Sequence, residues 1–242
     1  MKNYLVKTLF EVTDTKWSKD IDRSREENIF ESYQAMHNIS VKSHEACLEG
    51  DWELVFYGGE TDNIHQALKE TFYKIYELWS KEPCNILYTD PDTLMVAPTK
   101  IFGEFKEFRM FNVTDPKSFS EPNQYDKSYF KFLNAGVRYF PATMSQEIWD
   151  IGLKMAETWN LADWNTEQII LNEMAWSQNV TDMIQPKLAY QAFMIPGGEA
   201  WADEWNGCKF EDANIIHWHS SRHAKTKLHM METVAKQIGL TV

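Results

Sequence analysis

Strand and helix patterns alternate over the N-terminal part of the chain, and this alternation limits the folds available to it. Tyr4–Val12 and Trp52–Tyr57 are rich in β-branched and aromatic residues, which predicts strands, the second ending at two glycines. Helices are predicted near Arg25–Met36 and over Asn63–Lys81, where apolar residues recur every three or four positions. A further strand begins at Asn85. This order predicts an α/β fold with a mostly parallel central sheet flanked by helices.

The strand that begins at Asn85 ends in Asp90-Pro91-Asp92. Residues i and i+2 of an extended backbone face the same way, so the two carboxylates can converge on one hard cation. Ligands of open parallel sheets bind beyond the carboxyl ends of the strands, where this pair lies. The position favours a metal site over the alternative, an ordinary turn built from Asp and Pro.

The chain is strongly acidic, with 36 Asp and Glu against 24 Lys and Arg and a net charge of -12. Such a surface repels nucleic acid and anionic membranes, so neither is an expected partner. No apolar run is long enough for a transmembrane segment, and the three cysteines are far apart. We therefore expect one cytoplasmic domain spanning residues 1–242.

Imidazole and positive charge gather near the C-terminus. His217 and His219 lie on the same face of a predicted strand. Three basic residues follow them: Arg222, Lys225 and Lys227. In an otherwise acidic protein, this combination predicts an anion-binding site.

Two further segments have both a structural and a functional interpretation. Asn134-Ala135-Gly136 predicts a turn directly before a strand, where a small residue permits close approach of a ligand or only a plain turn. Gln168 stands three residues after Asn165, the spacing of a helix capping pair, so it has a structural role to weigh against a catalytic one.

These segments, in this order, resemble nucleotide-sugar glycosyltransferases of the GT-A type, most closely family 8, which includes glycogenin and bacterial galactosyltransferases. The resemblance spans about residues 4–227. Its motifs are a basic helix residue (Lys74), Asp90-Pro91-Asp92, Asn134-Ala135-Gly136-Val137, Glu167–Asn172, and His219 with Lys225 six residues later. The chain departs from family 8 in having Glu167-Gln168-Ile169 where Asp-Gln-Asp is usual, and in lacking the Gly and Pro-Trp of the terminal motif.

The resemblance implies that Mn²⁺ or Mg²⁺ binds Asp90, Asp92 and His219, and that Asp90 also lies near the ribose of the donor. His217 is the alternative third ligand, because it points the same way from a strand as His219 does. A ligand at either position would bring an imidazole to the acidic pair.

The resemblance also assigns the donor contacts. Lys225, together with Lys74 and Arg222, would hold the phosphates. Asn134 would face the donor sugar, and Glu167 and Gln168 would lie beside its anomeric carbon as the catalytic pair. Residues 1–112 would form the nucleotide-binding part, and residues 113–242 the acceptor side and C-terminal part.

The implied reaction is metal-dependent transfer of a hexose from a nucleoside-diphosphate sugar, with a UDP-sugar as the expected donor, to a glycan or other hydroxyl acceptor. If configuration inverts, a base is required, and Glu167, Asp203 and Glu204 are the candidates. Two alternatives stay open. One is a phosphatase or phosphotransferase of the haloacid-dehalogenase type, whose motif is also Asp-x-Asp. The other is a non-catalytic module that binds a nucleotide sugar.

Overall fold

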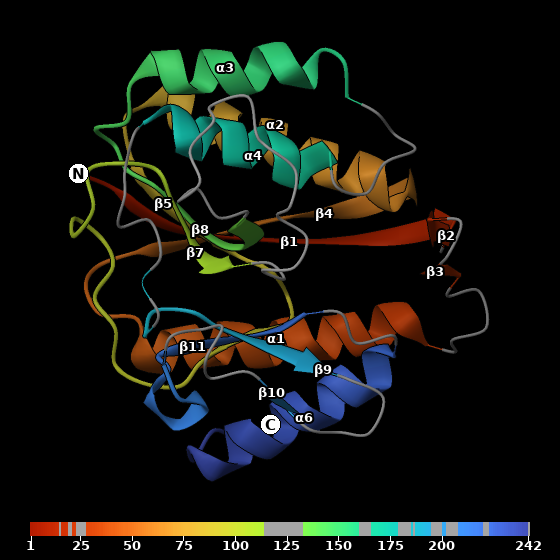
Figure 1. The fold of residues 1–242 in the computed structure, drawn as a ribbon. Helices are drawn as coiled ribbons and strands as arrows, with labels where there is room; N and C mark the ends of the chain where they lie inside the picture. Colours follow the sequence, from red (N-terminus) through yellow and green to blue (C-terminus); the bar gives the residue numbers. More distant parts are fainter. Residues whose placement is uncertain are drawn as a thin grey trace.

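A five-stranded sheet forms the centre of the fold (Figure 1). Its strands lie in the order β4 (Glu53–Asn63), β1 (Asn3–Asp14), β5 (Asn85–Thr89), β8 (Leu133–Phe140) and β7 (Arg109–Val113). Strands β4, β1 and β5 are parallel, whereas β8 runs antiparallel to both of its neighbours. The sheet is therefore mostly parallel, and the predicted fold class is confirmed.

This structure is a computed structural model of the chain. It describes residues 1–14, 16–18, 21–22, 28–113, 133–159, 166–178, 185, 187–194, 200–201, 208–219 and 223–241. The predicted loop from Thr114 to Lys127 lies outside these ranges, as do Asp203, Glu204 and Arg222.

Helices cover both faces of the central sheet (Figure 1). On one face lie α2 (Ile64–Lys81), α3 (Gln146–Ala156) and α4 (Thr166–Ser177), which share a core with the sheet through Phe72 and Trp149. On the other face lie α1 (Ile29–Cys47) and α6 (Ala224–Gln237), which pack against each other. A short hairpin, β2 (Lys16–Ser18) and β3 (Ile21–Asp22), follows β1.

A second, smaller sheet joins residues that are distant in sequence. Its order is β10 (Ala200–Trp201), β9 (Tyr190–Met194), β11 (Ile215–His219) and β6 (Thr93–Met95). Strand β11 is antiparallel to β6 and parallel to β9, and a 3₁₀ turn, η2 (Phe210–Asp212), precedes it. Because β6 begins four residues after the end of β5, the chain passes from the first sheet to the second through Asp90-Pro91-Asp92.

Helix α2 forms where its sequence predicts it. The Asn63 side chain accepts a hydrogen bond from the backbone N–H of Gln66 at 3.0 Å, which caps the first turn. Phe72, Ile75 and Trp79, spaced by three and four residues, are buried against the sheet. The predicted and observed ends of this helix agree to within one residue.

Three predicted boundaries are wrong. Strand β4 does not end at Gly58-Gly59 but continues to Asn63, because its pairing with β1 runs through both glycines. Helix α1 begins at Ile29 and extends to Cys47, well beyond the predicted end. The segment Asn134-Ala135-Gly136 is not a turn before a strand: it lies inside β8, where Asn134 pairs with Asn112 of β7.

Asn172 of α4 hydrogen-bonds the backbone at the start of β8. Its amide oxygen accepts from the Leu133 N–H at 2.7 Å, and its amide nitrogen donates to the carbonyls of Leu133 at 2.8 Å and Gln168 at 2.7 Å. We expect Asn172→Ala to lower the free energy of unfolding by about 2–4 kcal/mol, because buried backbone groups lose their partners. Urea denaturation measures this loss. Ile169→Ala on the exposed side of α4 is the control, and an equal loss in both variants would contradict the assignment.

Candidate metal centre

The acidic pair lies on a tight turn that follows the fully buried strand β5. The Thr93 N–H and hydroxyl both donate to the carbonyl of Asp90, at 3.2 and 2.7 Å, and close the turn around Pro91. The carboxylates of Asp90 and Asp92 lie close together, but through this turn and not through the predicted extended backbone, and their binding of a cation stays a prediction. The turn brings the carboxylates together, since the backbone reverses between the two sheets.

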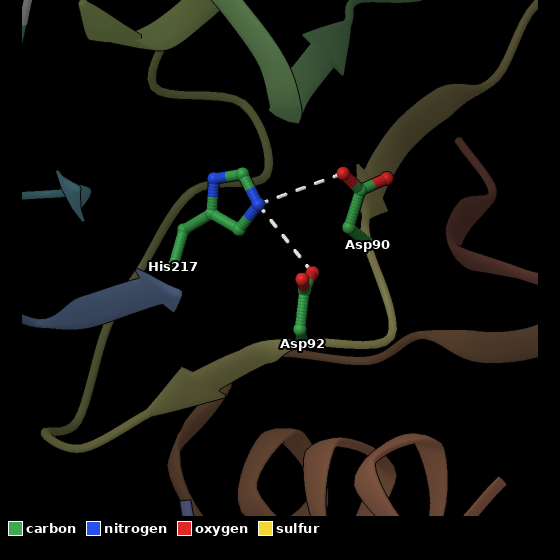
Figure 2. A group of neighbouring side chains, drawn as sticks. All are labelled: Asp90, Asp92 and His217. Atoms are coloured by element: carbon green, nitrogen blue, oxygen red, sulfur yellow. Dashed lines mark ion pairs between the residues drawn. The ribbon is translucent and has the colours of Figure 1, made fainter. Parts of the chain in front are cut away.

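His217 completes a group of three possible metal ligands (Figure 2). Its Nε2 lies 3.6 Å from Asp90 Oδ2 and 3.4 Å from Asp92 Oδ1. Asp92 and His217 are buried, whereas the side chain of Asp90 is 33% exposed, so the group has one open side. The residues fit a cation, because an ion that binds at about 2.1 Å holds neighbouring ligand atoms about 3 Å apart.

Strand pairing brings His217 to this position. His217 lies opposite Thr93 in the β11–β6 pair, and the Trp218 N–H donates to the Asp92 carbonyl at 3.0 Å. His219 lies two residues farther along β11, a shift of about 6.6 Å along the strand. The side chain of His219 is outside the described residues, so its assignment as the ligand stays a prediction, while the structure brings the alternative ligand to the acidic pair.

Gly136 makes room for the imidazole. A Cβ atom at this position would lie 2.2 Å from Cε1 of His217, far inside contact distance. The Gly136 carbonyl also accepts the Asp90 N–H at 2.8 Å. The close approach expected of this glycine therefore involves the protein's own histidine and the acidic turn.

Lys227 of α6 was predicted only as part of the basic C-terminal segment, and its contact with the acidic pair was not predicted. Its ammonium donates to Asp92 Oδ2 at 2.5 Å, and both side chains are buried. Burial alone would raise the pKa of the Asp92 carboxyl, but Lys227 and His217 outweigh it and hold that pKa below its ordinary value. Helical spacing was the available signal, because Lys227 falls on the buried stripe of Ala224, Met231 and Ala235.

The predicted phosphate contacts are not assembled around this group in the part of the chain that the structure describes. Lys225 is exposed on α6. Lys74 is exposed on α2, where it pairs with Glu77 at 3.4 Å and lies over the Tyr57 ring. Their assignments to the phosphates, like that of Arg222, stay predictions.

The predicted sugar-binding and catalytic residues lie together. The Asn134 amide donates to Gln168 Oε1 at 3.1 Å, and the Ala135 N–H approaches the same oxygen at 3.4 Å. Glu167 accepts from Arg138 at 2.7 Å. All four side chains of Asn134, Arg138, Glu167 and Gln168 are buried. The Asn165 half of the predicted capping pair is outside the described residues, whereas Gln168 binds β8 instead.

Arg138 links this group to the acidic turn. Its guanidinium lies 4.0 Å from the centre of the Tyr88 ring, and the Tyr88 hydroxyl donates to Asp90 Oδ1 at 2.9 Å. Burial raises the pKa of Glu167, and Arg138 offsets part of that rise. The two candidate parts of the site are thus connected through one buried tyrosine and one buried arginine.

A second buried lysine supports the turn from beneath. Lys7 of β1 donates to the Ser40 hydroxyl at 2.5 Å and lies 3.3 Å from both the Asp90 carbonyl and the Thr93 hydroxyl. Burial lowers the pKa of Lys7 to about 7, although Asp90 and Asp92 act in the opposite direction. Lysine side chains from β1 and from α6 therefore both contact the acidic turn.

Comparison with solved structures identifies the architecture. A glycosyltransferase involved in the glycosylation of the major capsid of PBCV-1 matches 96% of this chain over its own full length, with a TM-score of 0.52 and 12% identity. The fold is that of a glycosyltransferase. The apo structure of the bifunctional glycosyltransferase WbbM matches 99% of this chain over 50% of its own, with a TM-score of 0.57 and 11% identity. Neither the protein-family models nor the curated protein sequences give a match.

The helices in the described ranges are too short or too polar to span a membrane.

The lowered pKa of Lys7 predicts a pH-dependent stability. Between the folded pKa of about 7 and the unfolded value of 10.5, the unfolded chain binds one proton more than the folded chain. The free energy of unfolding should therefore rise with pH in this window, by up to about 1.4 kcal/mol per pH unit, and Lys7→Met should lose that rise. Urea denaturation in chelator at pH 7, 8 and 9 measures the difference. Lys154→Met, at an exposed position, should keep the wild-type slope, and parallel curves for wild type and Lys7→Met would contradict the prediction.

Proposed function

We propose that this protein is a metal-dependent glycosyltransferase that moves a hexose from a nucleoside-diphosphate sugar to a glycan or other hydroxyl acceptor, with a UDP-sugar as donor. The observation that carries the proposal is the convergence of Asp90, Asp92 and His217 at the end of β5 in a glycosyltransferase fold. Open sheets bind their ligands at this end of the strands.

Asp90, Asp92 and His217 would hold Mn²⁺ or Mg²⁺ in this proposal. When bound, the ion would supply positive charge to the departing nucleoside diphosphate. The protein's own residues fix the ligands: Tyr88 donates to Asp90, and Lys227 donates to Asp92. A cation is also what a chain of charge -12 needs in order to accept a diphosphate.

Asn134, Gln168 and Glu167 would form the side of the site that faces the donor sugar. The Asn134–Gln168 hydrogen bond supports this role, because it orients two amides that donate to and accept from hydroxyl groups. The ion pair of Glu167 with Arg138 favours a positioning role for Glu167 over that of a free general base. Lys225, Lys74 and Arg222 are the candidates for the phosphates.

Metal dependence and the choice of histidine are tested together. EDTA should abolish hydrolysis of the donor and Mn²⁺ should restore it. His217→Ala should raise the Mn²⁺ concentration for half-maximal activity at least tenfold, about 1.4 kcal/mol, because a ligand is lost. His219→Ala should change it less, and His229→Ala, exposed on α6, is the control.

Four results would contradict parts of this proposal. Full activity in chelator would contradict the metal dependence of the reaction. If His219→Ala raises the Mn²⁺ concentration for half-maximal activity more than His217→Ala does, His219 is the metal ligand, as the spacing to Lys225 implies. Release of inorganic phosphate from phosphomonoesters would support the phosphatase alternative, whereas a thermal shift with UDP-sugars and no turnover would support the binding module.

A further inference from the structure

The two oxygens of Asp92 have different partners. Oδ1 lies 3.4 Å from Nε2 of His217, on the side of the proposed cation. Oδ2 accepts from the ammonium of Lys227 at 2.5 Å. Asp92 therefore has one oxygen available to a metal ion and one that a protein cation already occupies.

Lys227 is fixed in this position by its surroundings. It is 4% exposed, its ammonium lies 5.6 Å from the centre of the Tyr33 ring, and Tyr33 belongs to α1. Helices α1 and α6 pack against each other, so the lysine is held from both sides. Moving it away would leave the buried Asp92 carboxylate without its hydrogen-bonded cation, which is strongly unfavourable.

The lysine also changes the charge that an incoming ion meets. Asp90 and Asp92 together carry two negative charges, and Lys227 returns one positive charge at hydrogen-bond distance from Asp92. A free divalent cation is thus attracted less than by an isolated pair of carboxylates.

We propose that Lys227 determines which cation this site takes and how tightly it holds that cation alone. With one oxygen of Asp92 occupied, the site suits a small ion that uses few protein ligands and completes its shell with water and substrate phosphates, as Mg²⁺ does. It disfavours Ca²⁺, which takes six to eight oxygens and often a bidentate carboxylate. The ion is then held firmly only together with the nucleoside diphosphate. This inference rests on the proposed function, because it concerns the same site.

The test compares Lys227→Met with Lys236→Met, an exposed lysine near the end of the same helix. Isothermal titration calorimetry of the full chain measures binding of Mn²⁺ and of Ca²⁺, each without nucleotide and with UDP. Without nucleotide, Lys227→Met should bind Mn²⁺ at least tenfold more tightly than wild type, and its affinity for Ca²⁺ should increase by a larger factor. Lys236→Met should match wild type.

A second variant keeps the inference testable if Lys227→Met does not fold. Lys227→Gln keeps a hydrogen-bond donor near Asp92 and removes the charge, so it should also tighten Mn²⁺ binding without nucleotide. The double variant Lys227→Met with Asp92→Asn, in which both charges are absent, should lose the gain. Circular dichroism establishes that each variant is folded.

The outcomes separate this inference from the proposed function. If wild type binds Mn²⁺ tightly only with UDP and the Lys227 variants show unchanged or weaker Mn²⁺ affinity without it, the role of Lys227 is overturned while the metal site stands. An equal gain for Mn²⁺ and Ca²⁺ overturns the selectivity. If wild type binds neither ion with or without UDP, the proposed function and this inference are both overturned.

Discussion

The turn from Asp90 to Thr93 connects the two sheets, and the rest of the site depends on it. Three hydrogen bonds define it: two from Thr93 to the Asp90 carbonyl, and one from the Asp90 N–H to Gly136 of β8. On its far side, β6 pairs with β11, which carries His217. A change in this turn would therefore move both carboxylates and the histidine relative to one another.

Buried basic side chains lie around this turn in a protein whose overall charge is negative. Lys7, Arg138 and Lys227 come from β1, β8 and α6, and all three are at most 4% exposed. Buried ion pairs are weak evidence for stability, because desolvation offsets most of their attraction. We interpret them as fixing the positions of Asp90, Asp92 and Glu167. The desolvation free energy of these side chains then goes into a site whose residues are ordered before its ligands bind.

Patterns among neighbouring residues predict helices and strands that form from one stretch of the sequence. The periodic apolar residues of α2 and the buried run of β5 predict their structures and place the acidic pair at a strand end. The predicted turn at Asn134-Ala135-Gly136 fails because small residues signal close approach as well as turns, and here the neighbour is His217. The interval from His219 to Lys225 favours one histidine, but the pairing of β11 with β6, a long-range contact, brings the other to the carboxylates. Lys227 was recognisable as buried from helical spacing, but its partner was not, since no local pattern specifies contact with a residue 135 positions away.

The proposed function requires that Asp90, Asp92 and His217 bind one divalent cation. The most direct measurement is an anomalous difference map from crystals grown with MnCl₂ and UDP. We expect a single strong peak within about 2.3 Å of Asp90 Oδ2, Asp92 Oδ1 and His217 Nε2, with Lys227 still bound to Asp92 Oδ2. Bound UDP without a peak between these atoms, or a peak whose imidazole ligand is His219, would contradict it.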